Sequence, residues 1–144
     1  MSHTEMLSAN GLITRQSKYS VDETIARFEA AIKAKADAGW VVFTRIDHAA
    51  AARKAGLELR ARTVIVFGNP KGGTPAMARS ATLAIDLPMK ALVWQDDQDK
   101  VWLSYNSSEY GSSYVFPRHG LSASDEATKK TETFLSDIAD QSTR

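Results

Sequence analysis

Two amphipathic segments, one near each end of the chain, constrain the fold more than any other feature of the sequence. In each, an apolar side chain recurs every three or four residues, which is the spacing of one face of an α-helix. The two stripes are Val21, Ile25, Phe28, Ile32 and Ala36, and Ala127, Thr131, Phe134, Leu135 and Ile138. A one-sided helix must bury its apolar face, so both helices need a partner layer.

The boundaries of these helices are marked by local capping signals. Ser20 is a favourable N-cap, and Glu23 three residues later completes a capping box. Gly39 is suited to the left-handed conformation that ends many helices. We therefore predict one long helix after Ser20 and a second beginning at about Ser124.

Segments rich in β-branched and aromatic residues favour strands before and between the helices. We predict strands at residues 12–18, 40–46, 63–67, 91–95 and 101–105. The last two flank a polar turn, which indicates an antiparallel hairpin. Residues 63–67 are apolar on both faces, which is typical of a central strand covered on two sides. The second cover would be the short helices or another copy of the chain.

Three connections between these strands have distinct compositions. Residues 48–55 are rich in alanine and predict a short helix. Residues 68–73 contain three glycines and predict a loop, followed by a helix with Thr74 as its cap and Pro75 at its first position. Residues 106–116 place tyrosines among serines and a glycine, and predict a long loop or lid.

The order strand, helix, four strands, helix predicts an α+β domain. Its antiparallel sheet carries two long helices on one face, with short helical insertions. Residues 1–11 are polar and without periodicity, so we predict a flexible N-terminus followed by a single domain over 12–144. A chain of 144 residues with 43% hydrophobic and 24% charged residues can build an ordinary hydrophobic core.

Charge and composition argue against several classes of partner. The 18 basic and 17 acidic side chains nearly cancel, so no general attraction to nucleic acid or anionic membranes is expected. No apolar run approaches the roughly twenty residues that span a bilayer, and no signal peptide is recognisable. The absence of cysteine excludes disulfides and thiolate metal sites. These features predict a cytoplasmic protein without nucleic-acid or membrane partners.

The glycine-rich connection is the first candidate for a binding site. Gly72 and Gly73 would let a ligand approach the backbone, and Lys71 would add positive charge. A helix start at Thr74 would present amide groups to an anion. The pattern differs from a P-loop, in which the lysine follows the glycines. The alternative is that Asn69 and the glycines only turn the chain.

Two histidines and two aspartates are the candidates for acid–base or metal chemistry. His48 follows Asp47 at the end of a predicted strand, and histidine titrates near neutral pH and binds metals. The alternative is that Asp47 only caps the following helix. If His48 and His119 met Asp86 in space, the three would form a metal or acid–base site, but their spacing does not establish that they meet.

Tyr105 ends the last predicted strand. It is either a core tyrosine with a bonded hydroxyl or the wall of a pocket shared with Trp102. No Gly-x-Ser-x-Gly elbow and no dinucleotide fingerprint occurs, so serine nucleophiles and nicotinamide cofactors have little support. The sequence indicates no particular cofactor.

Four segments resemble the bacterial and archaeal family called domain of unknown function 302. They are Ile46 to His48, Phe67 to Pro70 with Gly73 and Thr74, Ile85 to Pro88, and Val101 to Tyr105. The similarity covers about residues 12–121. It implies a fold similar to that of the TATA-binding protein, and a homodimer. It implies no chemistry, because the family has no agreed activity and a shared fold does not confer DNA binding.

Three functions remain open at this point. The first is a homodimeric module that binds a small anionic ligand or a metal near Asp47, His48, Asp86 and the glycine segment. The second is a hydrolase- or isomerase-like enzyme with a histidine–aspartate acid–base pair. The third is a purely structural dimerisation domain.

Overall fold

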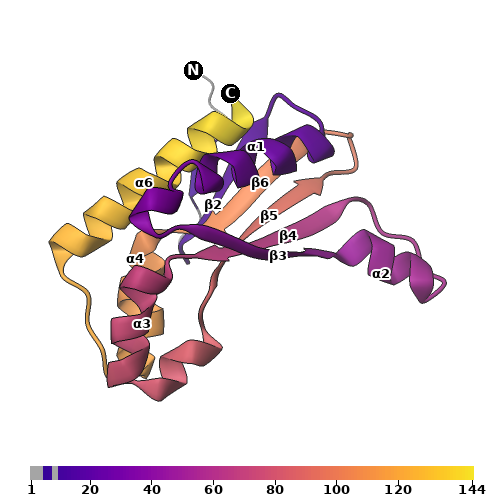
Figure 1. Cartoon of the computed structure of the whole chain (residues 1–144). Coiled ribbons are helices and arrows are strands. Elements are labelled where there is room, and N and C mark those ends of the chain that lie inside the picture. Colours follow the sequence, from indigo (N-terminus) through magenta and orange to yellow (C-terminus); the bar gives the residue numbers. More distant parts are fainter. Residues whose placement is uncertain (1–4, 8–9) are drawn as a thin grey trace.

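A computed structural model of the chain describes residues 5–7 and 10–144 (Figure 1). The strands are β1 (Glu5–Leu7), β2 (Leu12–Ser17), β3 (Val41–Asp47), β4 (Arg62–Gly68), β5 (Met89–Gln95) and β6 (Val101–Asn106). The longer helices are α1 (Val21–Lys33), α2 (His48–Lys54), α3 (Pro70–Arg79) and α6 (Asp125–Thr143). Shorter helical turns are η1 (Ala36–Ala38), η2 (Ala81–Ile85), α4 (Ser108–Tyr110), the π-helical η3 (Gly111–Val115) and α5 (Phe116–Arg118).

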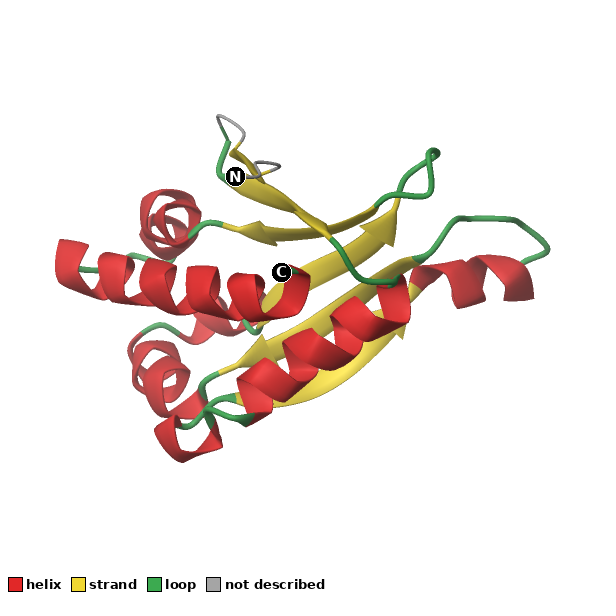
Figure 2. Ribbon diagram, turned by 90° about the horizontal axis from the view of Figure 1, so that it is seen from above, coloured by secondary structure: helices red, strands yellow, loops and turns green. Residues whose placement is uncertain are grey.

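The strands form one antiparallel sheet in the order β1-β2-β6-β5-β4-β3. Helices α1 and α6 lie side by side across one face of this sheet (Figure 2). From β2 onward the order is strand, helix, four strands and helix, with short helical insertions. The predicted α+β fold class is therefore confirmed.

Both long helices begin at the predicted caps. The Ser20 hydroxyl accepts a hydrogen bond from the Glu23 amide at 3.1 Å, and the Ser124 hydroxyl accepts one from the Ala127 amide at 3.0 Å. Each bond satisfies one of the amides that a helix start leaves without a partner inside the helix. Helix α1 ends at Lys33, and Gly39 ends η1 with a positive φ of 103°.

The hydrophobic core fills the space between the two long helices and the sheet. Phe67 of β4 meets Phe28 of α1 edge to face, with ring centroids 5.1 Å apart. Trp40 stacks on Phe134 of α6 at 3.9 Å. Both helices and the central strands supply the fully buried aliphatic side chains of this core, which include Ile32, Ile65, Val93, Leu103 and Ile138.

The other face of the sheet has a different character. Trp94 and Trp102, which are register partners on β5 and β6, stack there with ring centroids 6.1 Å apart. Along the described part of the chain no helix lies across this face (Figures 1 and 2). Large apolar side chains at its margins are exposed, namely Leu12, Phe43 and Ile46. Residues 63–67 form most of β4, which lies beside the edge strand β3 and not at the centre of the sheet. The short helices therefore do not supply the second cover expected for this strand.

Part of the segment predicted as a flexible N-terminus is a strand. Residues 5–7 form β1, which pairs antiparallel with β2 and extends the sheet by one edge strand. Residues 1–4 and 8–9 of that segment lie outside the described residues.

The glycine-rich segment is not the predicted loop: Gly68 ends β4, Asn69 is a helix cap, and residues 70–73 form the first turn of a helix. Helix α3 begins at Pro70, because the Asn69 side chain accepts a hydrogen bond from the Lys71 amide at 3.0 Å. Asn69 is thus the cap, Pro70 occupies the first helical position, and Pro75 lies inside the helix. The predicted cap at Thr74 is wrong.

The predicted lid over residues 106–116 is also helical. The Ser107 hydroxyl caps it by accepting a hydrogen bond from the Tyr110 amide at 3.1 Å. The Phe116 amide then bonds to the Gly111 carbonyl, five residues back, which is the π-helical pattern. Pro117 follows directly and has no amide hydrogen to continue the α-helical pattern, so the bonding changes register there.

Candidate functional site

Two connections meet at one end of the sheet. The first joins β4 to β5 through α3 and η2, and the second joins β6 to α6 through α4, η3 and α5 (Figure 1). The Ser80 hydroxyl donates a hydrogen bond to the His119 carbonyl at 2.8 Å and fixes one connection to the other. Side chains that are far apart in the sequence are thereby brought together.

Asp86, His119 and Thr82 form a hydrogen-bonded chain at this meeting point. His119 Nε2 lies 2.5 Å from Asp86 Oδ2, and His119 Nδ1 lies 2.7 Å from Thr82 Oγ1. Both ring nitrogens therefore have a partner. The His119 side chain is 4% exposed and that of Asp86 is 23% exposed, whereas Thr82 is an exposed residue. The ring is buried between two groups that reach solvent.

The groups around Asp86 determine the protonation state of its carboxyl group. The hydrogen bond from His119, supported by the positive charges of Arg118 and Lys90, holds the pKa of Asp86 below its ordinary value. Asp86 is therefore ionised at neutral pH and only accepts hydrogen bonds. His119 Nε2 must then donate to it. In a neutral imidazole this leaves Nδ1 as an acceptor, so the Thr82 hydroxyl donates to Nδ1.

In the glycine segment, the groups predicted to bind an anion are instead hydrogen-bonded to other groups of the protein. The Gly72 and Gly73 amides donate to the Asn69 carbonyl at 3.0 and 2.8 Å. The Lys71 ammonium lies 3.4 Å from the Asp37 carbonyl, and the Asn69 side-chain amide donates to the Ala38 carbonyl at 3.1 Å. These bonds attach the start of α3 to η1.

Asp47 and His48 lie elsewhere in the fold. Asp47 Oδ1 accepts a hydrogen bond from the Ala50 amide at 2.9 Å and so caps α2. His48 is exposed at the start of that helix, which projects from the opposite end of the sheet to α3 (Figure 1). The structure therefore unites His119 with Asp86 but not with His48. Among residues 5–7 and 10–144 no group of three or more potential ligands is arranged to hold a metal.

Tyr105 is part of the core and not of a pocket with Trp102. It is buried on the face of β6 that also carries Leu103, beneath the long helices. Side chains three residues apart on a strand point to opposite faces, so Trp102 lies on the open face with Trp94.

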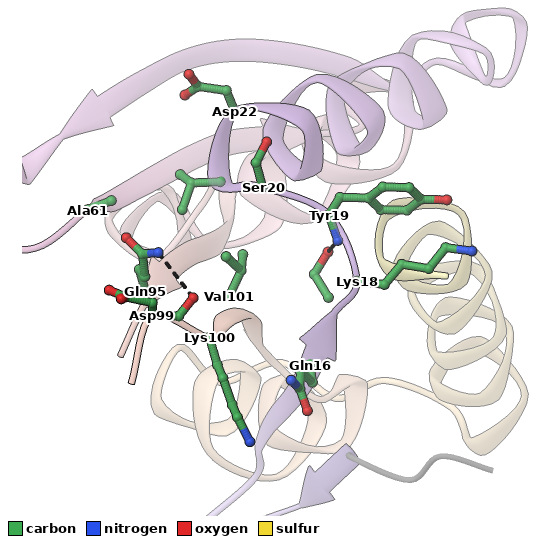
Figure 3. Close-up of a pocket in the computed structure, with 12 residues that line it drawn as sticks. Gln16, Lys18, Tyr19, Ser20, Asp22, Ala61, Gln95, Asp99, Lys100 and Val101 are labelled. Carbon is green, nitrogen blue, oxygen red and sulfur yellow. Dashed lines mark hydrogen bonds between the residues drawn. The ribbon is translucent and has the colours of Figure 1, made fainter. Parts of the chain in front are cut away.

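A surface hollow of about 780 Å³ lies beside the start of α1 and the β5–β6 turn (Figure 3). Its charged lining residues are Lys18, Asp22, Asp99 and Lys100, so the two signs balance. The Gln95 side-chain amide donates a hydrogen bond to the Asp99 carbonyl at 3.1 Å. None of the predicted site residues lines this hollow.

Thr82 is the member of the hydrogen-bonded chain that the sequence did not reveal. It lies 37 residues from His119 in a short turn between alanine and leucine, where a threonine carries no distinctive pattern. Only its contact with the His119 ring identifies it.

Over residues 13–138 the chain matches the family model described as Domain of unknown function DUF302. It is also 44% identical over 121 residues to Fluoride-specific ion channel FluC 1 of Brucella suis biovar 1 (strain 1330), covering 84% of this chain and 45% of that protein. The protein of the same name from Brucella abortus biovar 1 (strain 9-941) has the same identity, covering 84% of this chain and 42% of its own length. The chain thus spans less than half the length of these relatives.

A solved structure supports the same assignment. The uncharacterized conserved protein DUF302 from Bacillus stearothermophilus superposes with a TM-score of 0.71 at 17% identity, covering 90% of this chain and 96% of that one. In the part of the chain that the structure describes, no helix combines the length and apolarity needed to cross a membrane. Because the family model matches most of its length and a solved member shares its fold, the chain belongs to the DUF302 family of domains of unknown function.

Proposed function

We propose that the chain is a hydrolase- or isomerase-like enzyme that uses His119 and Asp86 as its acid–base pair. The single observation that supports this proposal is the contact between His119 Nε2 and Asp86 Oδ2, with the ring almost fully buried. A carboxylate on one ring nitrogen fixes the tautomer and stabilises the imidazolium that forms when the other nitrogen takes a proton. The predicted acid–base alternative thus has a geometric basis.

The surroundings of the pair favour a small anionic substrate. Arg118 lies 3.5 Å from Asp86, yet its side chain is 64% exposed and keeps donors directed to solvent. An arginine at the rim of an acid–base site is suited to binding a carboxylate or phosphate group.

A panel of ester, thioester, phosphoester and enolisable keto-acid substrates would test this function. We expect turnover of at least one class, and a loss of about 100-fold or more in kcat/KM for His119→Gln and Asp86→Asn. His48→Gln is the matched control, because this histidine is exposed and distant from the pair. Circular dichroism would confirm that each variant is folded. Unchanged turnover in both site variants, or no turnover of any class by the natural chain, would contradict the proposal.

We propose further that the chain acts as a homodimer joined through the open face of its sheet. Support comes from the Trp94–Trp102 stack and from the exposed side chains of Phe43 and Ile46 on that face. A second copy would cover these groups and remove apolar surface from water.

Sedimentation velocity would test the dimer directly. We expect a mass of roughly twice 15.8 kDa for the natural chain, and a shift to the monomer for Ile46→Glu because a charge would be buried in the interface. Leu57→Glu, which alters an exposed leucine in the connection after α2, should leave the dimer intact. If the natural chain sediments as a monomer at about 100 micromolar, where even a weak dimer would be populated, this assembly is refuted.

The Brucella relatives favour a second candidate function, as a domain that works beside a fluoride channel. This chain matches less than half of those proteins, and the described residues contain no helix able to cross a membrane. We infer that channel activity belongs to the remainder of the relatives, and that this domain contacts or regulates it.

A binding experiment would test this second role. The Brucella suis protein without its matched 121 residues would be reconstituted in vesicles, and fluoride efflux measured with and without the present chain. Binding to the vesicles together with an altered efflux rate is expected. Absence of both would exclude this role, and an unmatched soluble protein of similar size serves as the control.

A further inference from the structure

The burial of His119 limits how it can act on a substrate. Its side chain is 4% exposed, and both ring nitrogens already have partners in the protein. A substrate therefore exchanges protons with the ring either through the Thr82 hydroxyl or after displacing that hydroxyl from Nδ1. Of the two groups that the ring contacts, Asp86 fixes its orientation, and Thr82 alone presents an exposed hydroxyl.

We propose that Thr82 is the nucleophile of the site and that the reaction is hydrolysis of an ester bearing an anionic acyl group, through an acyl ester on Thr82. This inference rests on the proposed function, because it assigns the group through which the His119–Asp86 pair reaches the substrate. Hydroxyl, imidazole and carboxylate in a hydrogen-bonded chain are the arrangement that activates an alcohol nucleophile.

The turn that carries Thr82 is held firmly. The next residue, Leu83, is fully buried, and its amide bonds to the Ser80 carbonyl at 3.1 Å. The Ser80 hydroxyl in turn holds the His119 carbonyl. One short segment thus positions both the hydroxyl and the ring, which keeps the 2.7 Å contact between Thr82 Oγ1 and His119 Nδ1 preorganised.

The chemical step balances without a cofactor. Thr82 Oγ1 attacks the ester carbon while its proton passes to His119 Nδ1, and the departing alcohol oxygen takes that proton when its bond to carbon breaks. A water molecule then attacks the acyl ester and gives a proton to His119. The bond to Thr82 breaks and its oxygen recovers the proton. One ester and one water yield one acid and one alcohol.

Arg118 supports the choice of an anionic acyl group. A single contact of 3.5 Å joins its Nη1 to Asp86 Oδ2, so most of its five donors remain available at the exposed rim. A carboxylate on the substrate would accept two parallel hydrogen bonds from this guanidinium.

Intact-protein mass spectrometry with two p-nitrophenyl esters, the acetate and the mono-ester of succinic acid, would test the inference. We expect a burst of nitrophenol and an added acyl mass that peptide mapping places on Thr82. Thr82→Val should lose both signals and Thr82→Ser should retain them. Thr133→Val, at an exposed threonine of α6, is the matched control. The succinate ester should react about tenfold faster than the acetate, and Arg118→Gln should remove that preference.

The outcomes separate this inference from the function on which it rests. If Thr82→Val hydrolyses esters as the natural chain does while His119→Gln does not, the acid–base function stands with water as nucleophile, and the role of Thr82 is refuted. Acylation at any other residue also refutes it. If the natural chain acts on enolisable substrates but on no ester, the hydrolytic inference fails while the acid–base proposal survives.

Discussion

Replacing Phe67 by alanine is expected to lower the free energy of unfolding by about 3–5 kcal/mol. This side chain is 1% exposed and lies where β4 meets the helices. Its ring contacts Phe28 edge to face and lies 6.3 Å from the ring of Trp40. Truncation would leave a cavity bounded by two further aromatic rings, and rigid rings collapse poorly into empty space.

Urea denaturation followed by tryptophan fluorescence would measure this loss. Phe43→Ala is the matched control, because the same side chain is removed from a position that is 52% exposed. Measured at low protein concentration, the control should change stability by less than about 1 kcal/mol. Similar losses for the two variants would show that the core between helices and sheet is not centred on Phe67.

Gly39→Ala is expected to cost about 2–4 kcal/mol, the second largest effect. Gly39 has a φ of 103°, a conformation that alanine adopts only with strain. A Cβ atom there would also lie 2.5 Å from Asn69 Oδ1 and 2.9 Å from Lys71 Cδ. Asn69 caps α3, so moving its side chain would also weaken the start of that helix.

Gly56→Ala separates the two causes of this loss. Gly56 also has a positive φ, of 78°, but no atom lies within 4 Å of the position that a Cβ would take. Its substitution should cost only the left-handed strain, about 1–2 kcal/mol. Thermal unfolding of both variants would give the comparison. An equal cost at the two glycines would mean that the contact between η1 and α3 carries no stability.

The sequence was sufficient where the determining interactions are local. Ser20 and Ser124 cap the helices that follow them through bonds to residues three positions away. The middle of each predicted stripe identifies the buried face, at Ile25, Phe28 and Ile32 of α1 and at Leu135 and Ile138 of α6. The predicted stripe ends are wrong, because Ala36 lies beyond α1 and both Ala36 and Ala127 are exposed. Short-range patterns therefore predicted the α+β arrangement and the placement of both long helices.

The errors arose where a distant contact decides the local structure. Asn69 and Thr74 are both acceptable caps, and Asn69 is also bonded to the Ala38 carbonyl, 31 residues away. The helical turn at Ser108 is held by a hydrogen bond that its backbone amide donates to the carboxylate of Glu132 in α6. Periodicity and capping rules carry no information about such partners.

The candidate site shows the same division. Asp86 and His119 were recognised as candidates because their side chains titrate, but their separation of 33 positions in the sequence hides their contact. Thr82 lacks even that chemical signal. A sequence therefore suggests which groups are reactive, and only the fold shows which of them are neighbours.

The candidate site is built from the β4–β5 and β6–α6 connections, which lie outside the layers of long helices and strands. This location has an evolutionary consequence. Residues in such connections can be substituted without disturbing the hydrophobic core. The Bacillus stearothermophilus protein keeps the architecture at 17% identity, which shows how far sequences diverge around one scaffold. Descendants of a common ancestor would therefore be free to acquire different reactions at this end of the sheet while inheriting the same frame.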